Sequence, residues 1–191
     1  MYIIAGAYKH RKIATPKGLA TRPTAGQLRG ALFNICQNYI EGARFLDLFA
    51  GSGAMGLEAL SRGAVSATFI DSDRESIRCI QQNLRNLKLE GQARVLSGDV
   101  FHLVKKLAEQ GAQYDIIYVD PPYGASSKLM GKDILHVDQV MQLIDKGTLL
   151  APAGELFIET ASDAPPTIAT LQRLTLASSR RMGLASLHQF H

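Results

Sequence analysis

The 191-residue chain contains no tryptophan, only two cysteines and no apolar run near the ~20 residues that cross a bilayer. Its first six residues lack the basic and apolar regions of a signal peptide, so we expect a cytoplasmic protein. Cys36 and Cys79 have neither CxxC spacing nor clustered histidines around them. These absences argue against membrane-spanning, disulfide-rich and zinc-binding proteins, and they predict two buried, reduced thiols and no metal.

Acidic residues are also missing from the start of the chain, where Glu41 is the first. Six basic residues precede it, so residues 1–40 carry a charge of +6, whereas 15 bases and 17 acids give the remainder −2. Such a basic arm is typical of a protein that binds a polyanion, although a solvated, solubilising face has the same composition. We expect a basic extension over residues 1–40 that packs on a single domain over residues 41–191.

Strands and helices alternate along most of the chain. Short strands are expected at residues 1–5 and 9–14, and Thr24 has the side chain of an N-cap for a helix with one apolar face. Strands are then expected at 45–49, 68–70, 94–96, 115–119 and 155–160, with helices between them, including one at 137–146. This alternation predicts an α/β fold with a parallel sheet covered on both faces. Residues 171–177 and 184–190 predict a closing antiparallel hairpin.

A glycine loop follows the first of these parallel strands. Residues 51–56 match GxGxxG, and Gly51, Ser52 and Gly53 open the next helix, where backbone N–H groups can face a ligand. Asp71 comes 20 residues after Gly51, at the end of the next strand, where a carboxylate can accept from both hydroxyls of a ribose. These features alone suit NAD as well as S-adenosylmethionine.

Two further acids favour S-adenosylmethionine. Asp47 lies inside the strand before the loop, where its charge would repel a pyrophosphate but can hold an ammonium group. Asp99, followed by Val100, comes after the third strand and can accept from an adenine amino group. Structural roles remain open for each acid: Asp47 can satisfy backbone donors, Asp71 can cap the next helix and Asp99 can be an N-cap. All of them nevertheless fall at the carboxyl ends of parallel strands, where open α/β sheets bind ligands.

The fourth strand ends in the tetrapeptide Asp120-Pro121-Pro122-Tyr123. Two prolines remove two backbone donors and fix φ, so the carbonyls of Asp120 and Pro121 can face a ligand. With the Asp120 carboxylate they can accept the hydrogens of an exocyclic amine and direct its lone pair at a methyl donor. Tyr123 can cover a base or a sulfonium. The alternative is an ordinary turn that ends a strand.

Together these residues resemble the class I S-adenosylmethionine-dependent methyltransferases, and among them the RsmD-type 16S rRNA guanine-N2 methyltransferases. The resemblance covers nearly the whole chain and rests on residues 22–24, 32–34, 45–53, 57–64 and 120–123. It implies a Rossmann-like sheet of seven strands with an antiparallel last strand, and methylation of guanine 966 of 16S rRNA, free or within a 30S subunit. In that family an acid that holds the ribose is commonly Glu, so Asp73 is an alternative to Asp71. Arg180-Arg181 match only loosely and receive no role.

The resemblance leads to a mechanism in which Gly51, Ser52, Gly53, Asp47, Asp71, Asp99 and Val100 hold S-adenosylmethionine, while Asp120, Pro121, Pro122 and Tyr123 orient the guanine amine. RNA phosphates are assigned to Lys9, Arg11, Lys12, Arg22 and Arg29, or Arg22 reaches the cofactor carboxylate instead. We expect a monomer. An adenine-N6 DNA methyltransferase shares the tetrapeptide, an NAD-dependent dehydrogenase shares the glycine loop, and a non-enzymatic RNA-binding module needs only the basic arm.

Overall fold

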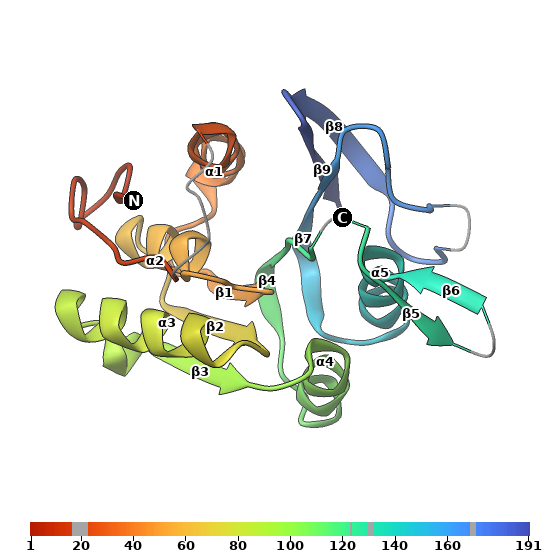
Figure 1. The fold of residues 1–191 in the computed structure, drawn as a ribbon, viewed down its shortest axis with the longest axis horizontal. Coiled ribbons are helices and arrows are strands. Elements are labelled where there is room, and N and C mark those ends of the chain that lie inside the picture. The colour runs from red at the N-terminus through yellow and green to blue at the C-terminus, as the bar shows by residue number, and fades with distance from the viewer. Residues whose placement is uncertain (17–22, 123, 130–131, 169–170) are drawn as a thin grey trace.

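A seven-stranded sheet forms the centre of the computed structural model, which describes residues 1–16, 23–122, 124–129, 132–168 and 171–191 (Figure 1). The strands lie in the order β3-β2-β1-β4-β7-β9-β8. Their bounds are β1 Arg44–Leu48, β2 Ser66–Asp71, β3 Ala93–Ser97, β4 Tyr114–Val119, β7 Leu150–Ala161, β8 Leu176–Met182 and β9 Ala185–Phe190. The first five strands of the chain in this sheet are parallel to one another, whereas β9 runs antiparallel to β7 and β8. The predicted fold class is confirmed.

Helices cover both faces of the sheet, as predicted, because each face carries its own hydrophobic core. One core joins the sheet to α1 (Pro23–Ile35), α2 (Ala54–Ser61) and α3 (Arg74–Leu87). The other joins it to α4 (Val100–Glu109) and α5 (His136–Lys146). Three-residue 3₁₀ helices follow α1 at Cys36–Asn38 and precede β3 at Glu90–Gln92. Cys36 and Cys79 are buried free thiols, which confirms the sequence prediction. None of the helices in the described part of the chain is long and apolar enough to cross a membrane.

Two helices start within two residues of the predicted positions. Helix α1 begins at Pro23 rather than after Thr24, because proline has the φ that a first helical turn needs. Ser72 and Glu75 have the spacing of a capping box in the sequence, but the N-cap of α3 is Asp73, whose side chain accepts from the Ser76 N–H at 2.8 Å. An aspartate carboxylate is a strong N-cap acceptor and displaces the predicted serine cap by one position.

The N-terminal segment does not form the two strands expected at residues 1–5 and 9–14. One antiparallel bridge joins Tyr2 to Lys12. The neighbouring backbone donors bind a side chain instead: the N–H groups of Ile4 and Ala5 donate to the Glu58 carboxylate at 2.8 and 3.0 Å. Gly6 has a φ of +83° and a Cβ there would lie 1.8 Å from the Ser61 carbonyl oxygen, so this close approach requires glycine.

Glu58 is fully buried and anchors this segment to α2. Its carboxylate also accepts from Arg62 Nε at 2.8 Å and lies 3.5 Å from Arg29 Nε in an ion pair. Ile3, Ile13 and α1 share a hydrophobic core with the sheet. The division at residue 40 into an extension and a domain stays a prediction, because the two parts are packed together through this core.

We expect Glu58→Gln to lower the free energy of unfolding by about 3–5 kcal/mol, since it leaves a buried arginine without its charge partner. The amide would also point a donor at groups that donate to Glu58. Urea unfolding measures the change, and Glu90→Gln, at an exposed position, is the matched control. A loss below about 1 kcal/mol would show that the buried carboxylate is not the anchor.

Two hairpins complete the chain. Strands β5 (Ser126–Leu129) and β6 (Lys132–Leu135) pair antiparallel outside the main sheet and were not predicted. The closing hairpin was predicted, but its first strand begins at Leu176 rather than at residue 171. The N–H groups of residues 172–174 donate to the Asp145 carboxylate and therefore do not enter the sheet. Exposed Arg180 and Arg181 lie on β8, the edge strand, where charged side chains oppose pairing with another chain.

Candidate active site

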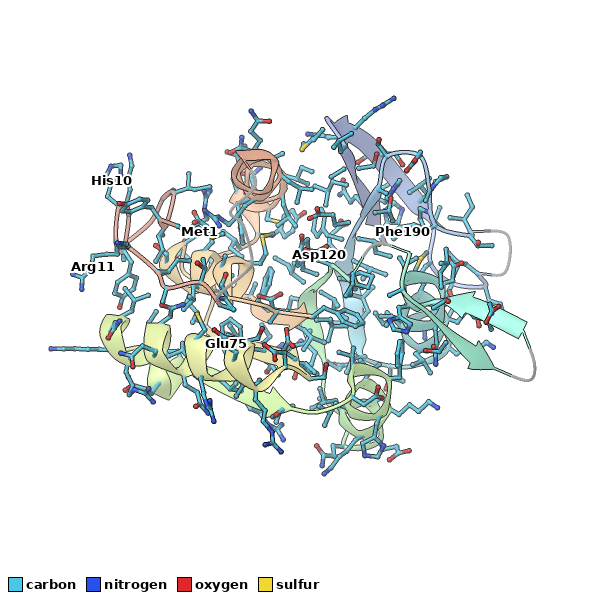
Figure 2. The ribbon with its side chains drawn as sticks, viewed as in Figure 1. Met1, His10, Arg11, Glu75, Asp120 and Phe190 are labelled. Atoms are coloured by element: carbon cyan, nitrogen blue, oxygen red, sulfur yellow. The ribbon has the colours of Figure 1, made fainter. Side chains whose placement is uncertain are left out.

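Acidic residues stand at the carboxyl ends of neighbouring strands. Asp99 follows β3, Asp71 ends β2, Asp47 lies one residue before the end of β1, and Asp120 follows β4. These four strands are side by side in the sheet, so the acids form a row along one edge. Figure 2 shows Asp120 near the middle of the molecule, where β1 and β4 end. The edge is the one where open α/β sheets bind ligands.

Asp47 is the buried member of the row, with 1% of its surface exposed. Its carboxylate accepts from the Gly56 N–H at 3.0 Å. The pKa of Asp47 is raised to about 8, mainly by burial and less by the charge of Asp71, whereas the Gly56 hydrogen bond opposes the rise. Among the described residues no lysine or arginine forms an ion pair with it. A buried carboxylate without a cation is a site that a ligand ammonium can complete.

Two of the predicted acids bind the glycine loop through its backbone: Asp71 accepts from Gly51 and Asp47 accepts from Gly56. Gly51 donates its N–H to Asp71 at 2.7 Å, and Gly53 donates to the Ala50 carbonyl, so these two groups are engaged within the protein rather than free to face a ligand. Gly53 has a φ of +76° at the N-cap of α2. Ser52 is 9% exposed, and its carbonyl accepts from Asn83 Nδ2 at 3.1 Å. The loop is therefore rigid where it approaches the edge of the sheet.

Asp71 and Asp73 differ in what their carboxylates bind. The two oxygens of Asp71 accept from the N–H groups of Gly51 and Asp73, at 2.7 and 2.8 Å. Asp73 is exposed and caps α3, and its hydrogen bond from the Ser76 backbone lowers its pKa. A carboxylate has about four acceptor positions. Asp71 is thus fixed in orientation and can still accept from hydroxyl groups, whereas the Asp73 side chain has the structural role.

An aromatic group that was not predicted lies beside Asp99. Asp99 is exposed and is the N-cap of α4, accepting from the His102 N–H at 2.8 Å, and Val100 is buried in the first turn. The next ring, Phe101, contacts His136 edge to face at 5.0 Å between centroids, and Phe49 stacks on the same histidine at 6.4 Å. Rings of this kind can stack on a flat purine. The sequence signal was a phenylalanine two residues after a strand-end acid.

The tetrapeptide at the end of β4 borders a small hollow. Asp120 donates its N–H to the Leu48 carbonyl at 3.4 Å, which ties it to the end of β1. Pro121 and Pro122 line a hollow of about 70 Å³, together with residues of α5 and of the end of β7. Tyr123 lies outside the described residues. Glu159 also lines the hollow; it lies two residues before the end of β7, just past the last residue paired with β4, and sequence analysis missed it. The signal was a charge directly after the apolar run 156–158.

The basic arm lies away from this edge. Lys9, Arg11 and Lys12 are exposed. Arg11 donates to the Asn86 carbonyl at 3.5 Å, near the end of α3 that is opposite to the acids, and Figure 2 shows it at the left edge of the molecule, whereas Asp120 lies near the middle. Helix α3 has 14 residues, so the arm and the row of acids are about 21 Å apart along it.

Arg29, the last basic residue of the arm, is buried. Arg29 was expected to bind RNA phosphates, but it is only 4% exposed, pairs with Glu58 and donates to the Tyr2 carbonyl at 2.8 Å. The expectation is wrong for this residue, because one buried carboxylate recruits its charge into the core. Burial also lowers its pKa. Arg22 lies outside the described residues.

The chain is similar to one protein family over its whole length. The family described as "Conserved hypothetical protein 95" matches residues 1–191. Ribosomal RNA small subunit methyltransferase D of Haemophilus influenzae is 31% identical over 96% of this chain and 90% of its own length. The protein of the same name from Escherichia coli K12 is 35% identical over 87% and 78%. A solved structure described as "Putative methyltransferase yhhF from Escherichia coli" superposes with a TM-score of 0.80 at 30% identity, over 100% and 96%. The chain belongs to this family, the RsmD-type methyltransferases.

Proposed function

We propose that this protein transfers a methyl group from S-adenosylmethionine to the exocyclic N2 of one guanine in 16S rRNA. The observation that carries the proposal is the row of strand-end acids, in which three lie on the glycine-loop side and Asp120 stands beside two prolines. The relatives named as small subunit rRNA methyltransferases support rRNA as the substrate. The choice of guanine rests on the family resemblance.

The residues on the glycine-loop side fit S-adenosylmethionine. Asp47, buried and without a cation among the described residues, would hold the ammonium group next to the loop of Gly51, Ser52 and Gly53. Asp71, fixed by two backbone N–H groups, would accept from the ribose hydroxyls. Asp99 and the neighbouring Phe101 would hold the adenine ring by its amino group and its face. When bound, the cofactor supplies an electrophilic methyl on a cationic sulfur.

On the other side of the row, Asp120 would accept a hydrogen of the guanine amine, with the Pro121 carbonyl as a second acceptor and Tyr123 over the base. The lone pair of N2 is delocalised into the ring, so the protein must hold it in line with the methyl group. Positioning of this kind can supply on the order of 7–11 kcal/mol. The guanine must leave any helical stack to reach the edge of the sheet.

Incubation with labelled S-adenosylmethionine tests the proposal. Naked 16S rRNA, isolated 30S subunits and plasmid DNA are offered in parallel, and the product nucleoside is identified by mass spectrometry. N2-methylguanosine at one position of the rRNA is the expected result. N6-methyl-2′-deoxyadenosine from DNA would replace the proposal with an adenine-N6 DNA methyltransferase, and RNA binding without S-adenosylhomocysteine binding would indicate a non-enzymatic module.

The exposed arm residues Lys9, Arg11 and Lys12 are proposed to contact RNA phosphates that flank the target nucleotide. If each neutralises one phosphate, the affinity for RNA should fall roughly 40-fold between 50 and 200 mM salt on the duplex-DNA scale. Replacing all three with glutamine should weaken binding and remove most of that salt dependence. Lys105, Lys106 and Lys146, exposed on α4 and α5, are the matched control set. Equal losses of RNA affinity from both sets would show that binding depends on the net charge of the protein and not on the arm.

A further inference from the structure

Glu159 stands next to Asp120 at the edge of the sheet. Ile158 of β7 pairs with Val119 of β4 in parallel register, so Glu159 and Asp120 occupy the next positions on adjacent strands. Neighbouring strands are about 4.8 Å apart. Glu159 also lines the hollow beside Pro121 and Pro122. Two carboxylates therefore flank the place where the target amine is proposed to sit.

Tyr118 orients the Glu159 carboxylate through a hydrogen bond. Its hydroxyl donates to Glu159 Oε2 at 2.6 Å, and the ring is 3% exposed. Burial raises the pKa of Tyr118 well above its usual value, and the charges of Asp120 and Glu159 raise it further, so both carboxylates lie near this one hydroxyl. A neutral hydroxyl that donates to Glu159 leaves the negative charge on the carboxylate. The pair Tyr118 and Glu159 thus presents a fixed acceptor beside Asp120.

The purines differ in what they offer two neighbouring acceptors. Guanine has an N–H at N1 directly beside its N2 amine, so its edge presents donors at both positions. Adenine presents its N6 amine beside a lone pair at N1, and a carboxylate next to that lone pair is repelled and left unpaired. A site that pairs a buried or partly buried charge with one substrate rejects an analogue that lacks the donor.

We propose that Glu159 accepts the N1–H of the target guanine while Asp120 accepts from N2, and that Glu159 thereby selects guanine. The inference rests on the proposed function and adds the residue that reads the base. The N1–H bond to a carboxylate also increases electron density on the adjoining N2, which assists its attack on the methyl group. Glu159 touches the substrate in this arrangement, whereas Tyr118 is a positioning residue.

The test compares two substrates that both carry the 2-amino group. One is the rRNA fragment with its mapped guanine, and the other has 2-aminopurine at that position, which lacks the N1–H. Wild type is expected to prefer guanine by roughly 100-fold or more in kcat/KM, since a site built for the missing donor is left with an unpaired charge. Glu159→Gln, which can still accept from Tyr118 and can donate to N1 of 2-aminopurine, should lower kcat/KM on guanine roughly 10- to 100-fold. It should reduce the preference to below about 10-fold.

Two measurements separate this role from a structural one. Affinity for S-adenosylhomocysteine should stay within about twofold in Glu159→Gln, because Glu159 lies on the target side of the row. Tyr118→Phe, which keeps the carboxylate, should retain most of the preference for guanine. If wild type methylates guanine but Glu159→Gln keeps the full preference over 2-aminopurine, the inference is overturned and the proposed function stands. If wild type does not methylate guanine N2, both are overturned.

Discussion

Asp120→Ala should reduce methyl transfer at least about 10³-fold while the affinity for S-adenosylhomocysteine changes by no more than a few fold. The loss is large because the amine would keep its delocalised lone pair and lose the acceptor that orients it, so part of the positioning contribution disappears from the transition state. Cofactor binding should persist because Asp47, Asp71 and Asp99 lie on other strands of the row. Asp120→Asn retains an oxygen acceptor and should lose less activity than alanine.

Single-turnover kinetics with saturating RNA measure this loss, and calorimetry measures cofactor affinity. The matched control is Asp115→Ala, at the other end of β4, where the carboxylate pairs with Arg44 at 2.9 Å. That pair is partly exposed and should contribute no more than about 1 kcal/mol to stability and nothing to transfer. Full activity in Asp120→Ala would sink the catalytic assignment and leave the tetrapeptide as a turn.

Asp47→Asn should raise the thermal stability of the free protein and weaken cofactor binding. The pKa of Asp47 in the folded state is raised to about 8 by burial, from an unfolded value near 3.8. Between these values the folded state holds a proton that the unfolded state has lost, so stability falls as pH rises through this window. Asparagine removes that cost and keeps an acceptor for the Gly56 N–H.

The stability difference between the variant and the wild type depends on pH. Variant and wild type should melt alike near pH 4, and the variant should melt higher by a margin that grows up to pH 8. Each pKa unit corresponds to ~1.4 kcal/mol, and for a chain of this size 1 kcal/mol shifts Tm by roughly 2–4 °C. A difference of more than about 4 °C is therefore expected at pH 7. Differential scanning calorimetry across this range measures it.

Saturating S-adenosylhomocysteine should reverse the order of the two melting temperatures at pH 7. Its ammonium would stabilise the ionised Asp47 and has no charge partner in the asparagine variant, for which we expect at least about 10-fold weaker binding. A buried carboxylate that costs stability in the free protein is typical of a functional rather than a structural group. Equal affinities for wild type and variant would contradict the ammonium assignment and leave Asp47 as an acceptor for the loop alone.

Local sequence signals predicted the elements that form the site because they depend on short-range geometry. Residues 114–119, before Asp120, are mostly apolar and do not alternate with polar residues, as is typical of a strand that is covered on both faces. They form β4, in which all residues but Asp115 are buried. The apolar positions of α3 recur at helical spacing and are buried as a face. The expected hairpin at residues 1–14 is reduced to one bridge between Tyr2 and Lys12, and the N–H groups of Ile4 and Ala5 bind Glu58, more than 50 residues away, a contact that no local pattern indicates.

By itself, the sequence determined the α/β fold, the edge of the sheet at which Asp47, Asp71, Asp99 and Asp120 gather, and the family, because the parallel sheet and the strand-end positions follow from the alternation of elements and from short motifs. Only the tertiary structure decided which charges are available there. It placed Arg29 in the core against Glu58, assigned the helix cap to Asp73 rather than Asp71, and set Glu159 beside Asp120. These outcomes depend on burial and on contacts between residues distant in the chain, and no local pattern specifies them.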